Sequence, residues 1–537
     1  MVTRRQSLKL MGTGAAALWQ SQRGGRSAAQ TSAKAPWAVW DYPTPPIRGG
    51  YYRRAAALDV GLLNPNHWPV NDWLVINQMH EKLLVTDGSY RPVPWLADAW
   101  TFPDPTTCVM KLKQGVRFSD GTPFNAAAVK FVEEWIMDPK NGCWTAGWLK
   151  PLKSVYVVEE HTLRWSFHEP WASFLGVLAN VPGYMMSPKA LRDDPKRYDT
   201  QPVGTGPYIL EDRSPGNWIK VRRNPHWWFG KSVGRPEMPY FDGILTTVIP
   251  DPSVELANLR AGKLDGMTLG KSHYEAVRSD SNLAVNLGPV NHVRGYSFNH
   301  AKPPFNDRRV RQAVAYAIDR KALIAGIEFG IGRIASCMYP DDHWAHNPEL
   351  KPWPFDPELA KRLLREAGHG NGLTVTGYVI SDTQSRARAE AVKAMLAEIG
   401  ITWKVDFLAP VAASDRMKNL EFDLAGSDWT WIYDPDLMAT GRYHPNGGFN
   451  YGRNKIDAAI ALIEKGRREV DLDRRQKVYW ELERVLYENC ADVWVFWEMS
   501  PTTFSKRLMG YDFEMSARHK EIWYWSHPLW FRNGRPG

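Results

Sequence analysis

The 537-residue sequence has few cysteines and no long apolar run. Its four cysteines, Cys108, Cys143, Cys337 and Cys490, allow three pairings, and no two of them have the C-x-x-C spacing of a zinc or redox site. No stretch approaches the ~20 consecutive apolar residues that cross a bilayer. The 44% hydrophobic and 23% charged residues are ordinary for globular proteins, so a fibrous or disordered chain is excluded. The length predicts several domains.

The sequence also has little excess charge outside its first residues. The net charge is +9, but residues 1–29 contain five basic residues and no acid. The 62 basic residues that remain against 58 acidic ones leave only +4. Because a nucleic-acid-binding protein clusters its charge in a run or stripe, and no run follows residue 29, we expect no nucleic-acid partner.

Common catalytic motifs are absent. The sequence has no G-x-S-x-G, no H-E-x-x-H and no phosphate-binding G-x-x-x-x-G-K-[ST]. His343 and His346 stand near two aspartates, a spacing more typical of a solvated loop than of a metal site. Asp434, Asp436 and His444 could serve a glycoside hydrolase, although Asp-Pro-Asp is equally good turn chemistry. We therefore expect no catalytic residue, metal or cofactor and no enzyme, with a secreted glycoside hydrolase as a remote alternative.

The N-terminus has the order of an export signal. Residues 3–9, T-R-R-Q-S-L-K, resemble a twin-arginine motif, and a short apolar segment covers residues 10–19. The small residues at 27–29 then form an acceptable cleavage site. We expect residues 1–29 to be an export signal that is cleaved near Ala29 and releases the protein into the periplasm.

Hydrophobic periodicity predicts mixed helices and strands. A strand is predicted over 107–113, and a helix is predicted to start near Asn125. Residues 306–325 carry an apolar helical stripe, with Arg308, Arg309, Arg311 and Arg320 mostly on the other faces. Further along, a helix is predicted over 356–368. The alternation β-α-β-α-β is then predicted over 373–380, 385–399, 401–408, 414–420 and 422–429. This order predicts a parallel sheet whose ligands lie beyond the carboxyl ends of the strands.

Tryptophan is abundant, with 26 residues in the chain. Most should supply buried area, but Trp68, Trp144, Trp148, Trp429 and Trp431 stand next to Gly, Pro, Asn or Asp or other loop residues. Such loop tryptophans are candidates for lining a ligand cavity.

Several ordered motifs together resemble one family. They are L-A-D-A-W at 96–100, G-V-R-F-S-D-G-T-P-F at 115–124, G-T-G-P-Y at 204–208, F-N-D-R-R-V-R-Q-A at 305–313 and A-I-D-R at 317–320. The sequence resembles the family 5 extracellular solute-binding proteins of ABC importers, the peptide, opine and nickel group. The resemblance covers residues 49–511.

This resemblance implies an α/β fold, the two-lobed periplasmic-binding-protein clamshell of class II in its large three-subdomain form. Lobe I would contain residues 36–292, with an inserted subdomain at about 81–199, and would be completed by 500–537. Lobe II would contain 295–495, and two crossings near 293–299 and 494–500 would form the hinge. The implied function is capture of a solute between the lobes by a monomer that delivers it to an ABC transporter membrane permease.

The resemblance also bears on the ligand. In peptide-binding members an Asp three residues after the Trp of the final-strand loop pairs with the ligand's amino group. Here Trp429 matches that Trp, and the third residue on is Ile432. An ammonium without a charge partner is costly to bury. We therefore expect a non-peptide solute such as an oligosaccharide, a glycoside or an opine-like conjugate, with a di- or oligopeptide as the alternative.

Eight residues are the candidate ligand contacts. Trp429, Trp431 and Tyr433 would form the wall and stacking surface, and Asp434 would be the polar anchor. On the opposite lobe and at the hinge, the candidates are His67, Trp68, Arg294 and Tyr296.

Overall fold

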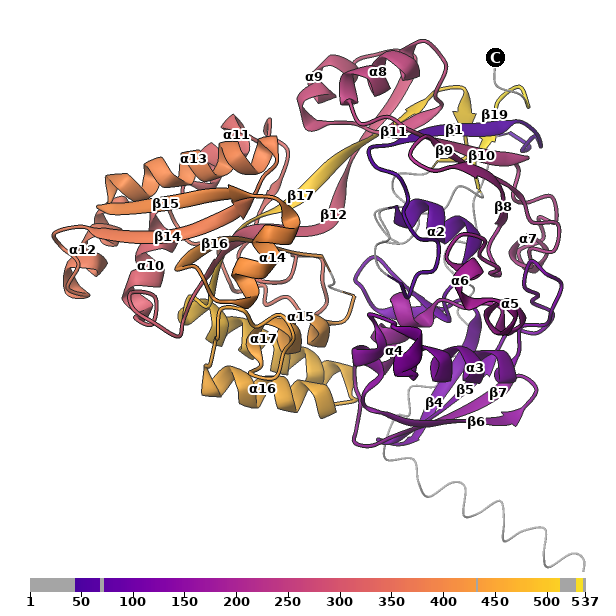
Figure 1. Cartoon of the computed structure of the whole chain (residues 1–537), viewed down its shortest axis with the longest axis horizontal. Helices are drawn as coiled ribbons and strands as arrows, with labels where there is room; N and C mark the ends of the chain where they lie inside the picture. Colours follow the sequence, from indigo (N-terminus) through magenta and orange to yellow (C-terminus); the bar gives the residue numbers. More distant parts are fainter. Residues whose placement is uncertain (1–43, 68–71, 431–432, 512–527, 535–537) are drawn as a thin grey trace, which may run out of the picture.

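The computed structural model describes residues 44–67, 72–430, 433–511 and 528–534. The predicted export signal at 1–29 lies outside these residues. The chain forms two lobes connected by two long strands, β12 (Leu283–Phe298) and β17 (Asp492–Ser505) (Figure 1). We refer to the lobe that contains β1–β11 as lobe I and to the lobe that contains α10–α17 as lobe II. None of the helices in the described ranges has the length and apolar character that a membrane span needs.

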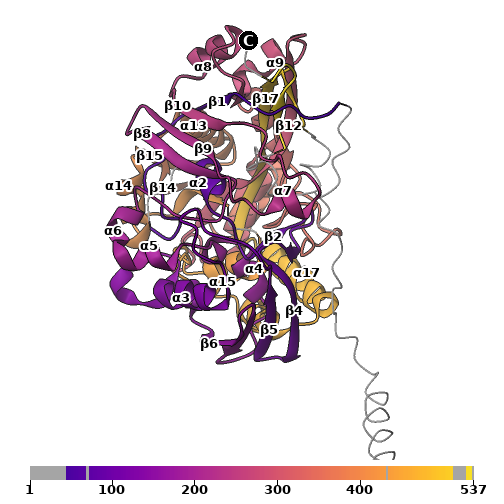
Figure 2. The same ribbon diagram turned by 90° about the vertical axis from the view of Figure 1, so that its right-hand side faces the viewer.

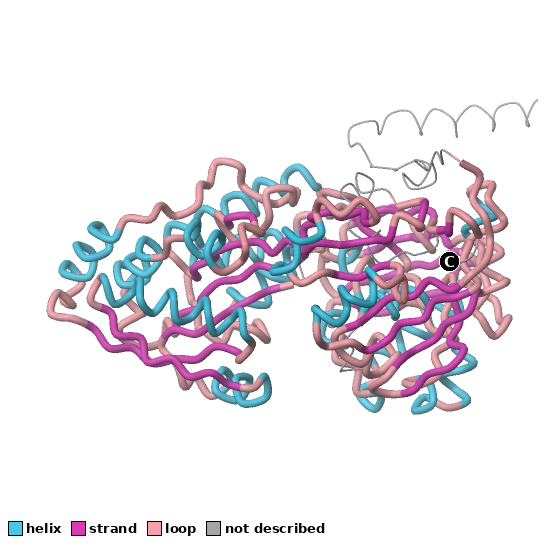
Figure 3. The backbone as a smooth tube through the Cα atoms, turned by 90° about the horizontal axis from the view of Figure 1, so that it is seen from above, coloured by secondary structure: helices cyan, strands magenta, loops and turns pink. Residues whose placement is uncertain are grey.

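One nine-stranded sheet extends through both lobes, in the order β16-β12-β17-β11-β1-β10-β9-β8, with β13 (Arg333–Ile334) also paired to β17. Figure 3 shows strands of this sheet running from one lobe into the other. The antiparallel pairing of β12 with β17 changes register between Pro289 and Val293. This interruption lies where the chain passes between the lobes, slightly before the crossing predicted at 293–299. The lobe boundaries themselves stay a prediction.

Lobe I has the sheet strands at one end and a second sheet at the other (Figure 2). The first group is β1 (Tyr51–Ala56), β8 (Tyr208–Ser214), β9 (Trp218–Arg223), β10 (Gly243–Val248) and β11 (Gly266–Thr268). The second is an antiparallel sheet of β4 (Ala97–Asp104), β5 (Thr107–Leu112), β7 (Thr162–Phe167) and β6 (Leu152–Glu159). Two strand pairs are short: β2 (Leu84–Thr86) with β3 (Pro92–Pro94), and β18 (Leu508–Met509) with β19 (Trp530–Phe531). The helices are α2 (Trp73–Met79), α3 (Ala126–Met137), α4 (Phe174–Leu178), α5 (Pro188–Asp193), α6 (Pro195–Tyr198), α7 (Phe229–Ser232), α8 (Pro252–Arg260) and α9 (Tyr274–Val277).

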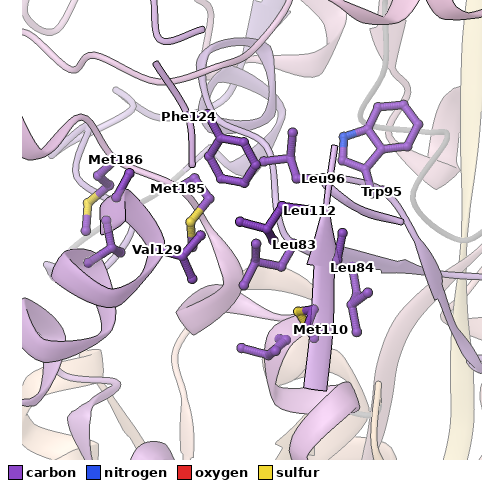
Figure 4. Packing of buried hydrophobic residues seen from close by; sticks show 14 of the residues in the cluster. Leu83, Leu84, Trp95, Leu96, Met110, Leu112, Phe124, Val129, Met185 and Met186 are labelled. Atoms are coloured by element: carbon purple, nitrogen blue, oxygen red, sulfur yellow. The ribbon is translucent and has the colours of Figure 1, made fainter. Parts of the chain in front are cut away.

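The helix predicted at Asn125 is confirmed. Asn125 is the N-cap of α3, and its side chain accepts a hydrogen bond from the Ala128 N–H. The apolar face of α3 packs in the largest core of lobe I, where Figure 4 shows Leu83, Leu112 and Phe124 close together. The predicted strand at 107–113 is β5, which places Cys108 in the same core.

Lobe II contains the predicted alternation of helices and strands. Its elements are α10 (Arg308–Ala317), α11 (Arg320–Gly326), α12 (Pro357–Glu366), β14 (Leu373–Ile380), α13 (Thr383–Glu398), β15 (Ile401–Leu408), α14 (Pro410–Lys418), β16 (Leu424–Trp429), α15 (Pro435–Tyr443), α16 (Asp457–Arg468) and α17 (Leu472–Glu488). Only β14 and β15 pair in parallel, whereas β16 pairs antiparallel with β12. The single parallel sheet predicted from these three strands is therefore wrong, because the crossing strand β12 is the ladder partner of β16.

Two of the four arginines that accompany the apolar stripe of residues 306–325 are buried. Arg311 and Arg320 are 5% and 3% exposed, respectively. Arg311 donates to the backbone carbonyls of residues 305, 306, 489 and 490, and Arg320 donates to those of 315, 318, 353 and 494. A guanidinium has five N–H donors, so each arginine satisfies several buried acceptors that no apolar side chain could. The two arginines therefore attach α10 and α11 to the start of β17.

The four cysteines are buried free thiols. Burial raises the pKa of Cys143 and Cys490 to about 12, so both thiols are un-ionised at neutral pH. None of the four cysteines forms a disulfide.

Candidate functional site

A cavity of about 370 Å³ lies where lobe I meets the crossing strands. Its walls come from β1, α2, β9, β10 and β11 of lobe I and from residues 288–290 and 498–500 of the crossing. Most of the lining is apolar: Tyr52, Leu74, Val75, Ile219, Val221, Ile244, Met267, Pro289, Val290, Met499, Phe504 and Leu529. This volume and composition are typical of a site for a small organic ligand. We call it the hinge cavity.

Three charged side chains line the hinge cavity, and each one has an ion-pair partner. Arg54 lies 3.1 Å from Asp72, and the Lys271 Nζ lies 2.5 Å from the Glu328 Oε2. Glu498 is the third, and its partners are at the crossing. Glu328 belongs to lobe II, so its ion pair with Lys271 joins the two lobes.

A cluster of four charged residues surrounds the register change. Arg294 binds Glu498 through Nε at 2.8 Å and Asp428 through Nη1 at 2.7 Å. His292 lies 3.2 Å from Asp428 and 3.4 Å from Glu498. Burial alone would raise the pKa of Glu498, but His292 and Arg294 more than offset it, and the pKa is well below its ordinary value. Burial alone would lower the pKa of His292, yet Asp428 and Glu498 raise it. The crossing therefore carries two acidic and two basic side chains whose charges offset one another.

A smaller cavity of about 110 Å³ lies in lobe II, at the carboxyl ends of β14 and β16. Arg294 and Tyr296, two of the predicted ligand contacts, line it together with Asp382, Arg388 and Asp428. That ligands lie beyond these strand ends stays a prediction, because the strands do not form the one parallel sheet from which it was drawn.

The lobes also touch far from the crossing, where α4 of lobe I meets α15 and α16 of lobe II (Figure 1). The Ala172 N–H donates to the Arg467 carbonyl at 2.9 Å. Gly176 lies so close to Asp434 that a Cβ at this position would be 2.4 Å from the Asp434 Cβ. Only glycine fits this approach between the lobes.

Asp434, predicted to be the polar anchor, is instead part of a buried ion pair. It is 3% exposed, and its Oδ1 and Oδ2 accept from the two terminal nitrogens of Arg475 at 2.7 and 2.8 Å. It is also the N-cap of α15, where Oδ1 accepts from the Asp436 N–H. Since both oxygens are occupied and Asp434 is not among the residues lining the hinge cavity, its geometry is that of a structural residue.

Trp429 and Tyr433 have different environments. Trp429 is 6% exposed and packs edge-to-face on Phe449, with ring centroids 5.3 Å apart, so it is core rather than a stacking surface. Tyr433 is half-buried between the lobes, where the Lys82 Nζ lies 5.5 Å from its ring and Tyr90 meets it edge-on. Trp431 lies outside the described residues.

The remaining predicted contacts also differ in whether they line a cavity or are bonded within one lobe. His67 is held within lobe I, with Nδ1 2.7 Å from Asp199 and Nε2 2.8 Å from the Asn141 carbonyl oxygen. The hydrogen bond to Asp199 is the main reason that the pKa of His67 is raised. Trp68 lies outside the described residues. Arg294 and Tyr296 are the two candidates that the structure brings together in one cavity.

The two other loop tryptophans within the described residues, Trp144 and Trp148, pack on protein groups. Trp144 and Trp148 meet edge-to-face at 5.3 Å, and the Trp144 indole donates to the Pro65 carbonyl. Three further indoles, those of Trp95, Trp227 and Trp228, donate to the buried carboxylate of Glu81. The tryptophan content is therefore explained in part by lobe I packing.

Sequence reasoning missed the lining of the hinge cavity. Tyr52 and Arg54 alternate along β1, so strand periodicity could have placed them on one face. No sequence pattern marks Lys271 or Glu498 as residues that line the cavity. The loop with His343 and His346 was also misjudged: both side chains are buried, and His346 lies 3.1 Å from Glu483. In the described part of the chain no group of His, Cys, Asp and Glu could hold a metal ion.

Comparisons with known proteins identify the family of this chain. Residues 91–450 match the family of bacterial extracellular solute-binding proteins, family 5, middle region. The chain belongs to this family. One relative is the glutathione-binding protein GsiB of Escherichia coli K12, 27% identical over 471 residues that cover 82% of this chain and 90% of GsiB.

Solved structures of similar fold confirm the two-lobed clamshell of this solute-binding protein. The periplasmic binding protein DppA of Helicobacter pylori, in complex with the peptide STSA, aligns with a TM-score of 0.76 at 23% identity, covering 90% of this chain and 98% of DppA. AgaA of A. tumefacien R10, in complex with agropinic acid, aligns with a TM-score of 0.76 at 21% identity, covering 90% of this chain and 99% of AgaA.

Proposed function

We propose that this solute-binding protein captures a small, amphipathic non-peptide solute, of the kind represented by opine-like conjugates, in the hinge cavity, where lobe I meets the crossing strands. The observation that supports this most directly is the hinge cavity itself, because strands that connect the lobes form part of its wall. A ligand there touches the segments that must move when the lobes close. It can favour closure by its greater affinity for the closed state.

The charge arrangement argues against a peptide with a free amino terminus. Ile432 replaces the aspartate expected three residues after Trp429. The nearby Asp434 has both oxygens on Arg475. Glu498, the acid of the hinge cavity, is held by Arg294 and His292. A ligand ammonium would have to break one of these ion pairs, at the cost of an unpaired buried charge.

Among non-peptide solutes, the lining favours an amphipathic conjugate over an oligosaccharide or a glycoside. Sugar recognition would use exposed aromatic faces, but Trp429, Trp144 and Trp148 pack on protein groups. The hinge cavity has mostly apolar walls, with a few hydroxyls and three charged side chains among its lining residues. A ligand with an apolar portion and a polar head matches this distribution.

A short peptide remains the second candidate. It is favoured by GsiB and DppA, whose names or titles refer to glutathione and a peptide. It requires that a group other than Asp434 compensates the ligand ammonium.

The route of the solute follows from the family. The protein would be exported through residues 1–29, act in the periplasm as a monomer and deliver its solute to an ABC transporter membrane permease. Binding without chemical conversion distinguishes this role from that of a secreted hydrolase.

Native mass spectrometry of protein purified gently from periplasm tests the proposal. We expect a co-purifying small molecule that is released unchanged on denaturation and is not a peptide. A ladder of peptide masses would reject the non-peptide solute and support the second candidate. In a parallel titration, agropinic acid should raise the melting temperature more than glutathione or the tetrapeptide STSA. A larger shift with either peptide would contradict the proposal.

A further inference from the structure

Lys271 is the charged residue of the hinge cavity whose ion-pair partner belongs to the other lobe. It lies in a short 3-10 turn, η5 (Lys271–His273), of lobe I, while Glu328 follows α11 in lobe II. The Lys271 side chain is 14% exposed and that of Glu328 is completely buried. Figure 1 shows α9, which follows η5, and α11 on the same, upper side of the crossing strands.

Glu328 also pairs with a second cation, Arg388. It would therefore keep an ion-pair partner if Lys271 left it for a ligand. The Arg388 Nη1 binds Glu328 Oε1 at 2.5 Å, whereas Lys271 binds Oε2. Arg388 is fixed in turn by Ser385, whose Oγ accepts from Nη2 at 2.8 Å. If Lys271 turned away, Glu328 would keep a charged partner from its own lobe. The cost of an unpaired buried carboxylate would thus be avoided.

The other charges of the hinge cavity are held more firmly. Asp72, the partner of Arg54, is also the N-cap of α2 and accepts from Leu74 and Val75 N–H groups. Glu498 is held by two cations at the crossing. Among the described lining residues, Lys271 is therefore the charge that can change partner at the lowest cost. A ligand group that pairs with the Lys271 ammonium must carry a negative charge.

The surroundings of Lys271 strengthen its need for an anion. The Phe496 ring lies 5.4 Å from the Lys271 Nζ and 5.9 Å from the Arg388 guanidinium carbon. An aromatic face and aliphatic walls exclude water, so an ion pair here is stronger than at the surface. A neutral ligand group would leave Lys271 on Glu328.

We infer that Lys271 binds the carboxylate or a similar anionic head group of the solute in exchange for Glu328. This inference rests on the proposed binding of a solute in the hinge cavity and specifies its chemical class as an amphipathic anion. Exchange would remove the ion pair that joins the lobes on this side of the crossing. Ligand binding would thereby be coupled to the angle between the lobes.

A matched pair of fluorescent probes tests the inference without knowledge of the natural solute. 8-Anilinonaphthalene-1-sulfonate and N-phenyl-1-naphthylamine share their apolar rings and differ in the sulfonate. Titrating the full-length protein with each probe separates anion recognition from occupancy of an apolar cavity. Met499→Trp, which fills part of the hinge cavity, should weaken both probes and thereby locate them there.

We expect Lys271→Met to weaken the sulfonate probe about tenfold, equivalent to about 1.4 kcal/mol, and to leave the neutral probe unchanged. Glu328→Gln should have the opposite effect and tighten the sulfonate probe, because it removes the competing carboxylate. Lys393→Met, at an exposed lysine of α13 that pairs with Glu390, is the matched control and should change neither probe. Lys271→Met leaves the Glu328–Arg388 pair intact, so it should fold even if Glu328→Gln does not.

Equal affinity of the sulfonate probe for wild type and Lys271→Met would overturn the inference while the cavity proposal stands. Equal weakening of both probes by Lys271→Met would overturn it as well, since the lysine would then act only through packing. If neither probe binds, or Met499→Trp affects neither, both the inference and the proposed hinge cavity site fail.

Discussion

Replacing Asp434 with asparagine removes the charge of a buried ion pair and keeps most of its shape. Arg475 is 5% exposed at its side chain and would lose its anionic partner, while it retains its bond to the Gly466 carbonyl. Burial alone would lower the pKa of Arg475, and the charge of Asp434 more than reverses this effect. Without Asp434, the guanidinium stays charged in a poorly solvated site.

The expected loss of stability is large. Breaking a buried ion pair at one partner costs about 3–5 kcal/mol. Asparagine preserves the N-cap of α15, so the capping contribution should persist. For a unit the size of a lobe, about 2–4 °C per kcal/mol gives a decrease in melting temperature of about 6–12 °C at the low end of that cost.

Differential scanning calorimetry on wild type and Asp434→Asn measures this decrease. Asp356→Asn is the control, because Asp356 caps α12 in the same lobe and forms no ion pair within the described residues. The control should melt within about 1–2 °C of wild type. An Asp434→Asn protein with normal melting and lost solute binding would refute the structural role and restore Asp434 as a ligand anchor. Unchanged melting with loss of a hydrolytic activity would instead indicate catalysis.

Three further outcomes follow from buried groups. Burial raises the pKa of Glu81 from 4.5 to about 7. Between these pH values the folded protein binds a proton that the unfolded chain has lost. The free energy of unfolding is therefore highest below pH 4.5 and falls as pH rises through 7. Relative to Glu81→Gln, wild type should lose about 3 kcal/mol across this window in denaturant titrations, and parallel curves would contradict the shift. Arg311→Met should lower the free energy of unfolding by at least about 2 kcal/mol, because it leaves several buried carbonyls without a hydrogen-bond donor. Arg308→Met, at an exposed neighbour, should leave the stability unchanged. Equal effects of the two substitutions would contradict the assigned contacts. The four buried thiols should resist Ellman's reagent in the native protein and all react in guanidinium, and a fast native thiol would show that one is accessible.

Local patterns were sufficient for most secondary structure. Asn125, Asp356 and Pro357 mark helix starts by their own chemistry, and α3 and α12 begin where they indicate. The helix predicted across 306–325 divides at Ile318, because Asp319 caps a second helix. That break has a local cause and could have been found.

Strand pairing required tertiary information. The β-α-β-α-β order correctly located β14, β15 and β16, but β16 pairs with β12, more than 100 residues earlier in the chain. Sequence order alone cannot show which edge a distant crossing strand occupies. Tyr296 and Arg294 lie on that crossing strand, where the family resemblance placed them, but their role as ligand contacts stays a prediction.

The sequence by itself determined the position of most helices, since capping, turns and periodicity act over a few residues, and the resemblance of its motifs to one family implied the fold class. The tertiary structure alone decided the partners of the charges: Asp434 with Arg475, and Lys271 with Glu328. A carboxylate has the same local signature whether it anchors a ligand, caps a helix or neutralises an arginine. Its role depends on which distant side chain shares its low-dielectric surroundings, and only the packing of the tertiary structure brings the two together.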